Sequence, residues 1–365
     1  MIKNCYIHIP FCNNICSYCD FCKIFYNENM VNRYLDSLEK EIDSIYKNEE
    51  LETIYIGGGT PSCLNIKQLE RLFIILSKLN KANNIEYTIE GNIQSTTKEK
   101  LLLYKKYGIN RLSLGIESIN KENLKLLERE TIKEEVIEKI KIMRNQGFNN
   151  INVDLIYAIP NETIKTLEED IDFILSLDVE HISTYSLIIE ENTKLYINNI
   201  KNIDEELDYE MYNLITKKLK DNNYNHYEIS NFAKDGYESI HNNCYWENRQ
   251  YYGFGLGASS YINDKRITNT RSISNYLNNR YIKEIENITE EIKEEYEVIL
   301  GLRLLRGINL DNYKKKYNKE LKDKYNYNDL LKENLLILKD GYLSIPEDKI
   351  YISNEIIVRL LEKEI

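Results

Sequence analysis

The sequence predicts an α/β protein: a partial (β/α)6-type, TIM-like barrel followed by a smaller C-terminal α+β domain of winged-helix type. Short apolar runs alternate with amphipathic segments over the first two-thirds of the chain, which is the pattern of parallel βαβ units. The alternation ends near residue 235, after which helices and a β-hairpin are expected. A chain of 365 residues is long enough for one large and one small domain.

The first part of the chain contains six or seven β/α units, enough for an open or a closed barrel. The expected strands are apolar runs at residues 6–9, 53–56, 86–89, 111–115, 152–156, 182–187 and 227–229. The expected helices repeat apolar residues at spacings of mostly three and four, at residues 31–46, 66–79, 98–107, 133–145, 164–177 and 205–219. In such a fold the functional loops follow the C-terminal ends of the strands.

Three parts are expected along the chain: a barrel domain at 1–235, a connecting segment at 236–285 and a small domain at 286–365. Residues 242–261 are rich in aromatics and glycine and show no helical period. In the small domain we expect helices at 290–306, 328–338 and 355–361. A β-hairpin formed by 341–346 and 349–352 lies between the last two.

Bulk properties favour a cytoplasmic protein that does not bind nucleic acid. The net charge of −11 argues against nucleic acid as the main partner, because phosphate binding needs clustered Lys and Arg. No apolar stretch approaches the length of a membrane-spanning helix, and the N-terminus lacks the pattern of a signal peptide. Seven cysteines without an export signal are expected to meet a reducing cytosol, where metal binding is favoured over disulfide formation.

The most specific pattern is a group of three cysteines, Cys12, Cys16 and Cys19, within eight residues. Soft thiolates select iron–sulfur clusters or zinc. Three thiolates hold three irons of a [4Fe–4S] cubane and leave the fourth iron open to a chelating ligand. Cys22 adds a fourth thiol, so a closed ferredoxin-like cluster or a zinc knuckle is the alternative. The spacing favours the open cluster.

Motifs around these cysteines resemble the radical S-adenosylmethionine (SAM) superfamily. Tyr6-Ile-His-Ile-Pro-Phe-Cys12 leads into the cysteines, and Ile56-Gly-Gly-Gly-Thr-Pro-Ser62 ends the next strand. More narrowly, the chain resembles the coproporphyrinogen oxidase-like branch, which includes the anaerobic oxidase and the haem chaperones. The resemblance implies a radical SAM barrel with a [4Fe–4S] cluster on Cys12, Cys16 and Cys19. It also implies SAM as cofactor, whose reductive cleavage gives a 5′-deoxyadenosyl radical.

The resemblance also implies that residues at strand ends and in the loops that follow contact SAM. These residues are Tyr6, Tyr18, Gly58, Gly59, Thr60, Glu90, Glu117, Arg129 and Asp154. Two positions depart from the family pattern: Ile93 stands where proline is common, and Glu117 stands where glutamine is usual. A carboxylate at 117 can accept hydrogen bonds from a ribose but cannot donate them. Without the resemblance, each of these residues would be an ordinary core or surface residue.

A second motif, His241-Asn-Asn-Cys-Tyr-Trp246, resembles the His-Asn-x-x-Tyr-Trp motif that the haem chaperones associate with haem binding. The resemblance implies His241 as a haem ligand, and imidazole is a standard axial ligand of iron. From the residue alone, a hydrogen-bonded structural histidine is the more common case. Cys244 is a second candidate, because thiolates also ligate haem.

Together these features favour a haem chaperone that binds haem as cargo and transfers it to haem-requiring proteins. The acceptor could lie at the membrane surface, and a homodimer is left open. Cys12 lies close to Met1, and Cys19 is followed by Asp20-Phe21, as in the chaperone group. The alternatives are oxygen-independent coproporphyrinogen III oxidase, which converts propionates to vinyls, and another radical SAM reaction on a tetrapyrrole. No catalytic residue is assigned, and whether the chain is an enzyme is left open.

Overall fold

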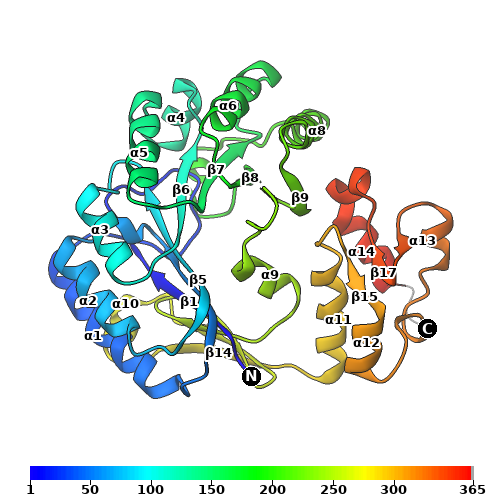
Figure 1. Cartoon of the computed structure of the whole chain (residues 1–365). Coiled ribbons are helices and arrows are strands. Elements are labelled where there is room, and N and C mark those ends of the chain that lie inside the picture. Colours follow the sequence, from blue (N-terminus) through cyan, green and yellow to red (C-terminus); the bar gives the residue numbers. More distant parts are fainter. Residues whose placement is uncertain (363–365) are drawn as a thin grey trace.

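The computed structural model describes residues 1–362 and contains one wide, curved sheet with a smaller body beside it (Figure 1). Six strands at the centre of the sheet are parallel and adjacent in chain order, which confirms the predicted α/β fold. They are β1 (Asn4–Ile9), β4 (Leu51–Gly58), β5 (Lys81–Asn92), β6 (Arg111–Glu117), β7 (Ile151–Tyr157) and β8 (His181–Ser186). The strands β9 (Asn225–Glu228) and β14 (Ile282–Asn287) form the two edges and do not pair with each other, so the barrel is open.

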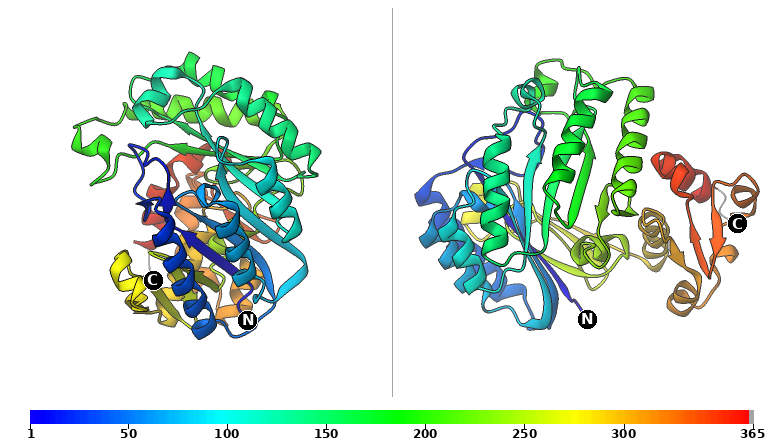
Figure 2. Two further views of the ribbon diagram at one scale, coloured as in Figure 1. Left: turned by 90° about the vertical axis from the view of Figure 1, so that its left-hand side faces the viewer. Right: turned by 45° about the horizontal axis from the view of Figure 1, so that its top comes forward.

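Helices cover the outer face of these strands (Figures 1 and 2). The six long helices of the barrel lie where the apolar periodicity predicts them. They are α1 (Glu28–Ile45), α2 (Ile66–Leu76), α3 (Lys98–Lys106), α5 (Lys133–Asn145), α6 (Ile164–Ser176) and α8 (Glu205–Asp221). In α1, the buried residues Val31, Leu35, Leu38 and Ile42 recur at spacings of three and four, and Asn27 caps the first turn by accepting a hydrogen bond from the Met30 N–H.

Short elements in the loops complete the barrel. They are β2 (Phe11–Cys12), β3 (Ile24–Phe25), η1 (Pro61–Cys63), α4 (Lys121–Leu127) and α7 (Lys194–Ile197). Beyond β8, β10 (Asn231–Ala233) and β9 (Asn225–Glu228) are antiparallel to their neighbours. The strand predicted at 227–229 is therefore part of an antiparallel edge and not a further parallel unit.

The segment at 236–285 extends the main sheet on its other side. β11 (Tyr251–Phe254) pairs in parallel with β1, and β12 (Ser259–Ile262), β13 (Lys265–Asn269) and β14 (Ile282–Asn287) follow in antiparallel order. The segment also holds two short helices, α9 (Ile240–Trp246) and α10 (Ile273–Leu277). The expectation of no helix at residues 242–261 is wrong for α9, which extends to Trp246, because seven residues are too few to display an apolar period.

The C-terminal body contains helices and a small antiparallel sheet, β15-β17-β16 (Figure 2). Its elements are α11 (Glu290–Gly301), β15 (Ile308–Asn309), α12 (Leu310–Tyr317), η2 (Leu321–Asp323), α13 (Asn328–Lys332), β16 (Ile337–Lys339), β17 (Tyr342–Ser344), η3 (Glu347–Ile352) and α14 (Ser353–Leu361). The helix predicted at 290–306 ends at Gly301, and the one predicted at 328–338 ends at Lys332. The domain boundaries at 235 and 285 stay predictions.

The hairpin of this body lies earlier in the chain than predicted. β16 pairs with β17 around Asp340 and Gly341, which both have positive φ values, 51° and 80°. An Asp-Gly pair favours a two-residue turn of this kind, and the turn fixes the register of the hairpin. Residues 349–352, expected as the second strand, are in the 3₁₀ helix η3 instead. Within residues 1–362, none of the helices combines the length and the hydropathy needed to cross a bilayer.

Candidate functional site

A cavity of about 700 Å³ lies inside the barrel and opens toward the loops that carry the cysteines. Its wall follows the two-residue period of the parallel strands, because alternate side chains of a strand point to the same face. The β6 side of the wall is formed by Arg111, Ser113, Gly115 and Glu117, and β7 contributes Asn152, Asp154 and Ile156. Most of these side chains are polar, which indicates a ligand with polar groups.

Every residue that the sequence assigns to the cluster or to SAM lines this one cavity. They are Cys12, Cys16, Cys19, Tyr6, Tyr18, Gly58, Gly59, Thr60, Glu90, Glu117, Arg129 and Asp154. The exception among the predicted site residues is the haem candidate His241, which is not part of the lining. The cavity therefore brings together residues that are up to 148 positions apart in the chain, from Tyr6 to Asp154.

The cysteines lie at the end of β2 and in the loop between β2 and β3. Parallel pairing of β2 with β3 holds the two ends of this loop together. In the middle of the loop, Ser17 donates two hydrogen bonds to the end of α4, from its N–H to the Leu127 carbonyl at 3.2 Å and from its hydroxyl to the Leu126 carbonyl at 2.6 Å. The loop is thus fixed to the barrel on both sides of Cys16.

The surroundings of the thiols fit an iron–sulfur cluster. A methyl group at Gly59 would come within 2.9 Å of Cys12 Sγ, so glycine leaves the space beside this sulfur open. The Thr60 hydroxyl donates to Cys12 Sγ at 3.6 Å, and Arg129 Nη1 donates to Cys16 Sγ at 3.8 Å. In residues 1–362, no three Cys, His, Asp or Glu side chains converge on a single ion. A cubane does not need such convergence, because each thiolate binds a different iron.

Cys22 differs from these three cysteines in its contacts. Its side chain packs against Gly257, where an added Cβ would lie 2.8 Å from Cys22 Cβ. Burial raises the pKa of the Cys22 thiol, and the neighbouring guanidinium of Arg271 lowers it. For Cys12, burial raises the pKa of the thiol to about 11. The hydrogen bond from Thr60 lowers this pKa, and the thiols of Cys19 and Cys16 raise it. Cys22 also lines the cavity, but it differs from the other three cysteines in packing against Gly257 and in lying beside Arg271.

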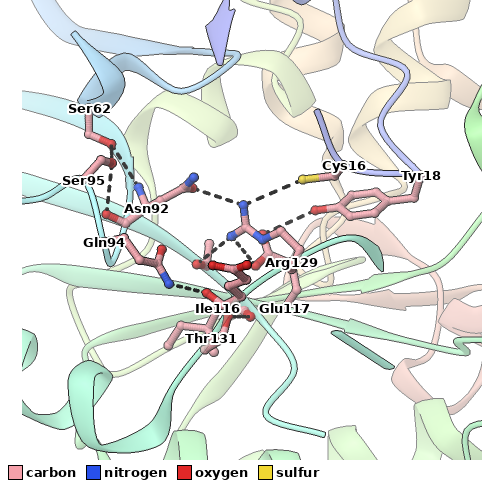
Figure 3. A network of polar contacts seen from close by, with 12 residues as sticks. Cys16, Tyr18, Ser62, Asn92, Gln94, Ser95, Ile116, Glu117, Arg129 and Thr131 are labelled. Carbon is pink, nitrogen blue, oxygen red and sulfur yellow. Dashed lines mark hydrogen bonds and ion pairs between the residues drawn. The ribbon is translucent and has the colours of Figure 1, made fainter. Parts of the chain in front are cut away.

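Arg129 is the centre of a polar network beside Cys16 (Figure 3). Its Nη2 atom forms an ion pair with Glu117 Oε2 at 2.5 Å and donates to the Gly115 carbonyl at 2.9 Å. Its Nη1 atom faces Asn92 Oδ1 at 3.3 Å as well as Cys16. Glu117 has a left-handed backbone (φ 61°), which turns its side chain back into the cavity at the end of β6. A guanidinium held in this way offers charge to an anionic ligand at the cysteine loop.

Two further carboxyl groups, Glu90 and Asp154, line the wall. Glu90 accepts hydrogen bonds from the Tyr55 hydroxyl at 2.8 Å and from the Gly58 N–H at 3.0 Å, and burial raises its pKa to about 7. Asp154 accepts a hydrogen bond from Asn152 Nδ2 at 2.8 Å, and burial raises its pKa as well. Glu90 is therefore oriented by donors from the neighbouring strand β4, and Asp154 by a donor from its own strand β7.

His241 lies on the inner face of the barrel near the N-terminal ends of the strands, beside the cavity-lining Tyr55. Its Nδ1 atom is 2.7 Å from Thr53 Oγ1, and its Nε2 atom is 2.8 Å from the Tyr245 hydroxyl. The ring stacks on Tyr55 at a centroid distance of 5.2 Å, and burial lowers its pKa to about 3. Both ring nitrogens thus have partners within the protein. Of the motif residues 241–246, Asn242 is the one that lines the cavity.

Two residues of the cavity that have functional potential were not assigned to the cluster, SAM or haem from the sequence. His8 follows Tyr6 on β1 by two positions, and its ring contacts the Tyr6 hydroxyl at 2.9 Å and the Cys22 carbonyl at 2.7 Å. Arg111 precedes Glu117 on β6 by six positions, and only 2% of its surface is exposed. Both residues could have been found from the sequence, because residues at even spacings along a strand point to the same face of the sheet. Tyr6 and Glu117, which the motifs had already assigned, provide the starting points for this count.

Comparisons with known proteins agree with this geometry. Residues 6–174 match the model of the radical SAM superfamily, and residues 289–348 match that of the HemN C-terminal domain. The chain is 38% identical to the heme chaperone HemW of Bacillus subtilis (88% of each chain). It is 37% identical to that of Lactococcus lactis (86% of this chain, 85% of the relative) and 30% identical to that of Escherichia coli (83% and 82%).

Among solved structures, the coproporphyrinogen III oxidase HemN of Escherichia coli has the same fold. It aligns with a TM-score of 0.86 over 98% of this chain and 89% of that chain, at 21% sequence identity. The predicted radical SAM fold is thereby confirmed. With its matched superfamily model and with relatives that are 30% or more identical over most of its length, the chain belongs to the radical SAM superfamily and, within it, to the HemW family.

Proposed function

We propose that this protein is a haem chaperone, which binds haem and transfers it to haem-requiring proteins. The observation that carries the proposal is the 38% identity to the heme chaperone HemW of Bacillus subtilis over 88% of both chains. The His-Asn-x-x-Tyr-Trp pattern at residues 241–246 supports it independently of overall identity. The acceptor would be a haem-requiring protein, at the membrane surface or in the cytosol. Seven free cysteines favour a reducing compartment, so we place the protein in the cytosol.

Cys12, Cys16 and Cys19 would hold a [4Fe–4S] cluster, with SAM as the ligand of the fourth iron. When bound, the two cofactors supply one-electron chemistry on the sulfonium of SAM. The chain's own residues position these groups. Thr60 and Arg129 donate to the cysteine sulfurs, which favours the thiolate form that iron needs.

Each of the nine residues assigned to SAM would contact the part of this cofactor that its side chain or backbone suits chemically. Arg129 would face the SAM carboxylate, because its guanidinium lies beside Cys16 and hence beside the cluster. Gly58 and Gly59 would let the methionine end approach the backbone next to Thr60. Glu90, Glu117 and Asp154 would accept hydrogen bonds from amino or hydroxyl groups, and the rings of Tyr6 and Tyr18 would cover apolar parts of the cofactor.

His241 remains our candidate for the haem ligand. Ligation requires a free ring nitrogen, so the bond to Tyr245 or the bond to Thr53 would have to open when haem binds. The alternative ligand Cys244 is fully buried, and burial raises the pKa of its thiol far above the usual value. A buried thiol of this kind is a poor source of thiolate. The contacts of the two residues therefore favour His241.

The experiment that tests the proposal compares haem transfer with turnover of a porphyrin substrate. Anaerobically reconstituted protein is loaded with haem, separated from free haem and mixed with apomyoglobin, and the Soret band of holomyoglobin is followed. In parallel, the protein is incubated with reductant, SAM and coproporphyrinogen III, and products are analysed by mass spectrometry. We expect stoichiometric haem binding, transfer, and no product above a control without SAM. Formation of protoporphyrinogen without haem binding would establish the oxidase instead.

A further inference from the structure

Arg111 is a buried cation without a partner. It begins β6, points into the cavity and is 2% exposed. Within residues 1–362, its guanidinium makes no hydrogen bond and no ion pair, and its Nε atom is buried without any acceptor. An unpaired buried charge costs several kcal/mol, and proteins normally avoid this cost by pairing the charge. A cation left in this state is poised for an anion that comes from outside the chain.

The polar groups around Arg111 form their hydrogen bonds with one another and not with it. Asn152 Nδ2 donates to Ser113 Oγ and to Asp154 Oδ1, both at 2.8 Å, and Asn152 Oδ1 accepts from Ser183 Oγ at 3.1 Å. Glu90 is bound to Tyr55 and to the Gly58 N–H. The charge of Arg111 lowers the pKa of Glu90 and of Asp154, so both lie within electrostatic range without pairing to it.

Arg111 lies far from the cysteine loop along the strand. Glu117 is six positions further along β6, and at roughly 3.3 Å per residue the two Cα atoms are about 20 Å apart. The Arg129–Glu117 pair and Cys16 are at the other end of β6. An anion beside the cysteines therefore does not satisfy Arg111. The cavity has a second cationic position, at its floor.

Asn242 supplies an amide group near this floor. It is half-buried, lines the cavity and belongs to α9, where the charge of Arg111 also acts on the neighbouring His241. Its side-chain amide makes no hydrogen bond with any described residue. A guanidinium fork with an amide N–H₂ matches the two oxygens of a carboxylate.

We propose that Arg111, with Asn242 beside it, binds a carboxylate of the ligand that enters the cavity, and that in haem this group is a propionate. The second half of this inference rests on the proposed function. The site lies at the end of the cavity remote from the cysteines, so one propionate arm reaches into the barrel while the cluster end remains free for SAM. The carboxylate of SAM is the other possible source of the same chemistry, and the experiment separates the two.

The test measures dissociation constants for haem and for haem dimethyl ester, in which both propionates are neutral. The variants are Arg111→Met, which removes the charge, and Arg111→Lys, which keeps the charge without the fork. Arg144→Met is the matched control, because Arg144 is bound to Glu180 at 2.8 Å and does not line the cavity. All proteins are reconstituted anaerobically, and the affinity for SAM is measured in parallel by equilibrium dialysis.

We expect the wild type and Arg144→Met to bind haem about tenfold to a hundredfold more tightly than the ester, as charged hydrogen bonds imply. Arg111→Met should bind both forms with the affinity of the ester, and Arg111→Lys should lie between. Without ligand, Arg111→Met should melt no lower than the wild type, because it removes an unpaired buried charge. A purely structural arginine would instead lower the melting temperature and leave the preference unchanged.

Each contrary result has a distinct meaning. An undiminished preference for haem over its ester in Arg111→Met, or in Arg111→Lys if the methionine variant does not fold, overturns this inference and leaves the chaperone proposal intact. A loss of SAM affinity with unchanged haem affinity identifies the anion as the SAM carboxylate and overturns the propionate assignment. Failure of the wild type to bind haem overturns the proposed function and the propionate assignment together.

Discussion

The Nδ1 atom of His241 lies 2.7 Å from the hydroxyl oxygen of Thr53, which joins α9 to the start of β4 across 188 residues of chain. The other ring nitrogen is bound to Tyr245, and the backbone N–H of His241 donates to Glu86 at 2.9 Å. The histidine of the haem-associated motif thus anchors a helix against the inner face of the barrel. Because His241 has these contacts, a structural role of the residue can be told apart from a role as haem ligand by measuring stability and haem binding of the same variants.

His241→Ala should lower stability by about 2–4 kcal/mol, because it removes two buried hydrogen bonds and the stacking on Tyr55. Tyr245→Phe should cost about 1 kcal/mol and free the Nε2 atom. If His241 ligates haem, Tyr245→Phe should keep or raise haem affinity, while His241→Ala should lose the low-spin Soret spectrum. Urea unfolding and haem titration measure the two effects. Identical haem spectra in all three proteins would exclude His241 as ligand.

Substitution of any one of Cys12, Cys16 and Cys19 by alanine should abolish the absorbance near 400 nm of the reconstituted cluster, together with its EPR signal after reduction. Cys22→Ala is the matched control from the same loop. We expect this variant to retain the cluster, because the Cys22 side chain packs against Gly257. Iron and sulfide analysis provides the stoichiometry. Loss of the cluster in Cys22→Ala would favour a closed, four-cysteine site.

Gly59→Ala should prevent cluster assembly and also lower fold stability, because two of the atoms that the methyl group would meet belong to the backbone. The added methyl group would lie 2.9 Å from Cys12 Sγ and 2.8 Å from the Pro10 carbonyl carbon, so it would displace the cysteine loop. Gly108→Ala is the control, because its methyl group would meet no atom within 4 Å, although its φ of 84° disfavours alanine by about 1 kcal/mol. The iron content of both variants measures cluster assembly, and circular dichroism measures whether each variant is folded. A Gly59→Ala protein with full iron content would contradict the expectation.

Arg129→Met should weaken SAM binding at least about tenfold, because a guanidinium–carboxylate contact in a half-buried site is lost. Glu117→Gln should retain most of the affinity, since the amide oxygen still accepts from Arg129 and glutamine restores a donor at this position. Equilibrium dialysis with labelled SAM measures both variants. A stronger effect of Glu117→Gln than of Arg129→Met would show that the carboxylate itself is the essential group.

Glu162 should make the protein less stable as the pH rises from about 5 to 8. Burial raises the pKa of this carboxyl group to about 8, and Asp170 adds to the shift. The unfolded chain releases the proton near pH 4.3, so stability is full below that pH and is lost progressively up to the folded pKa, on the order of 5 kcal/mol in total.

Glu162→Gln has no proton to release, and its amide oxygen can accept one of the two hydrogen bonds that the carboxyl group accepts from Asn123 Nδ2 and from the Ile159 N–H. Urea unfolding at pH 5.5 and 8.5 should therefore show a smaller pH difference for Glu162→Gln than for the wild type. The exposed neighbour Glu169→Gln serves as the control and should keep the wild-type difference. An equal difference in all three proteins would contradict the assignment.

Much of the candidate site could be proposed from the sequence because its signals are local. The spacing of Cys12, Cys16 and Cys19 fixes three sulfurs within one loop. The motifs at Glu90, Glu117 and Asp154 lie at or near the C-terminal ends of their strands, and parallel neighbours bring such ends to one side of a sheet. All twelve residues assigned to the cluster or to SAM consequently line one cavity.

The tertiary structure alone decided the rest, because burial and pairing depend on segments that are distant in the chain. β11 joins β1 across more than 240 residues, and the hydrogen bonds of His241 come from Thr53 and Tyr245 on two separate elements. Nothing local distinguishes Arg111 from an arginine on the surface. In the folded chain, Asn152 forms hydrogen bonds with Ser113 and Ser183 from the neighbouring strands. Arg111 is therefore left without a partner, and its charge faces the cavity.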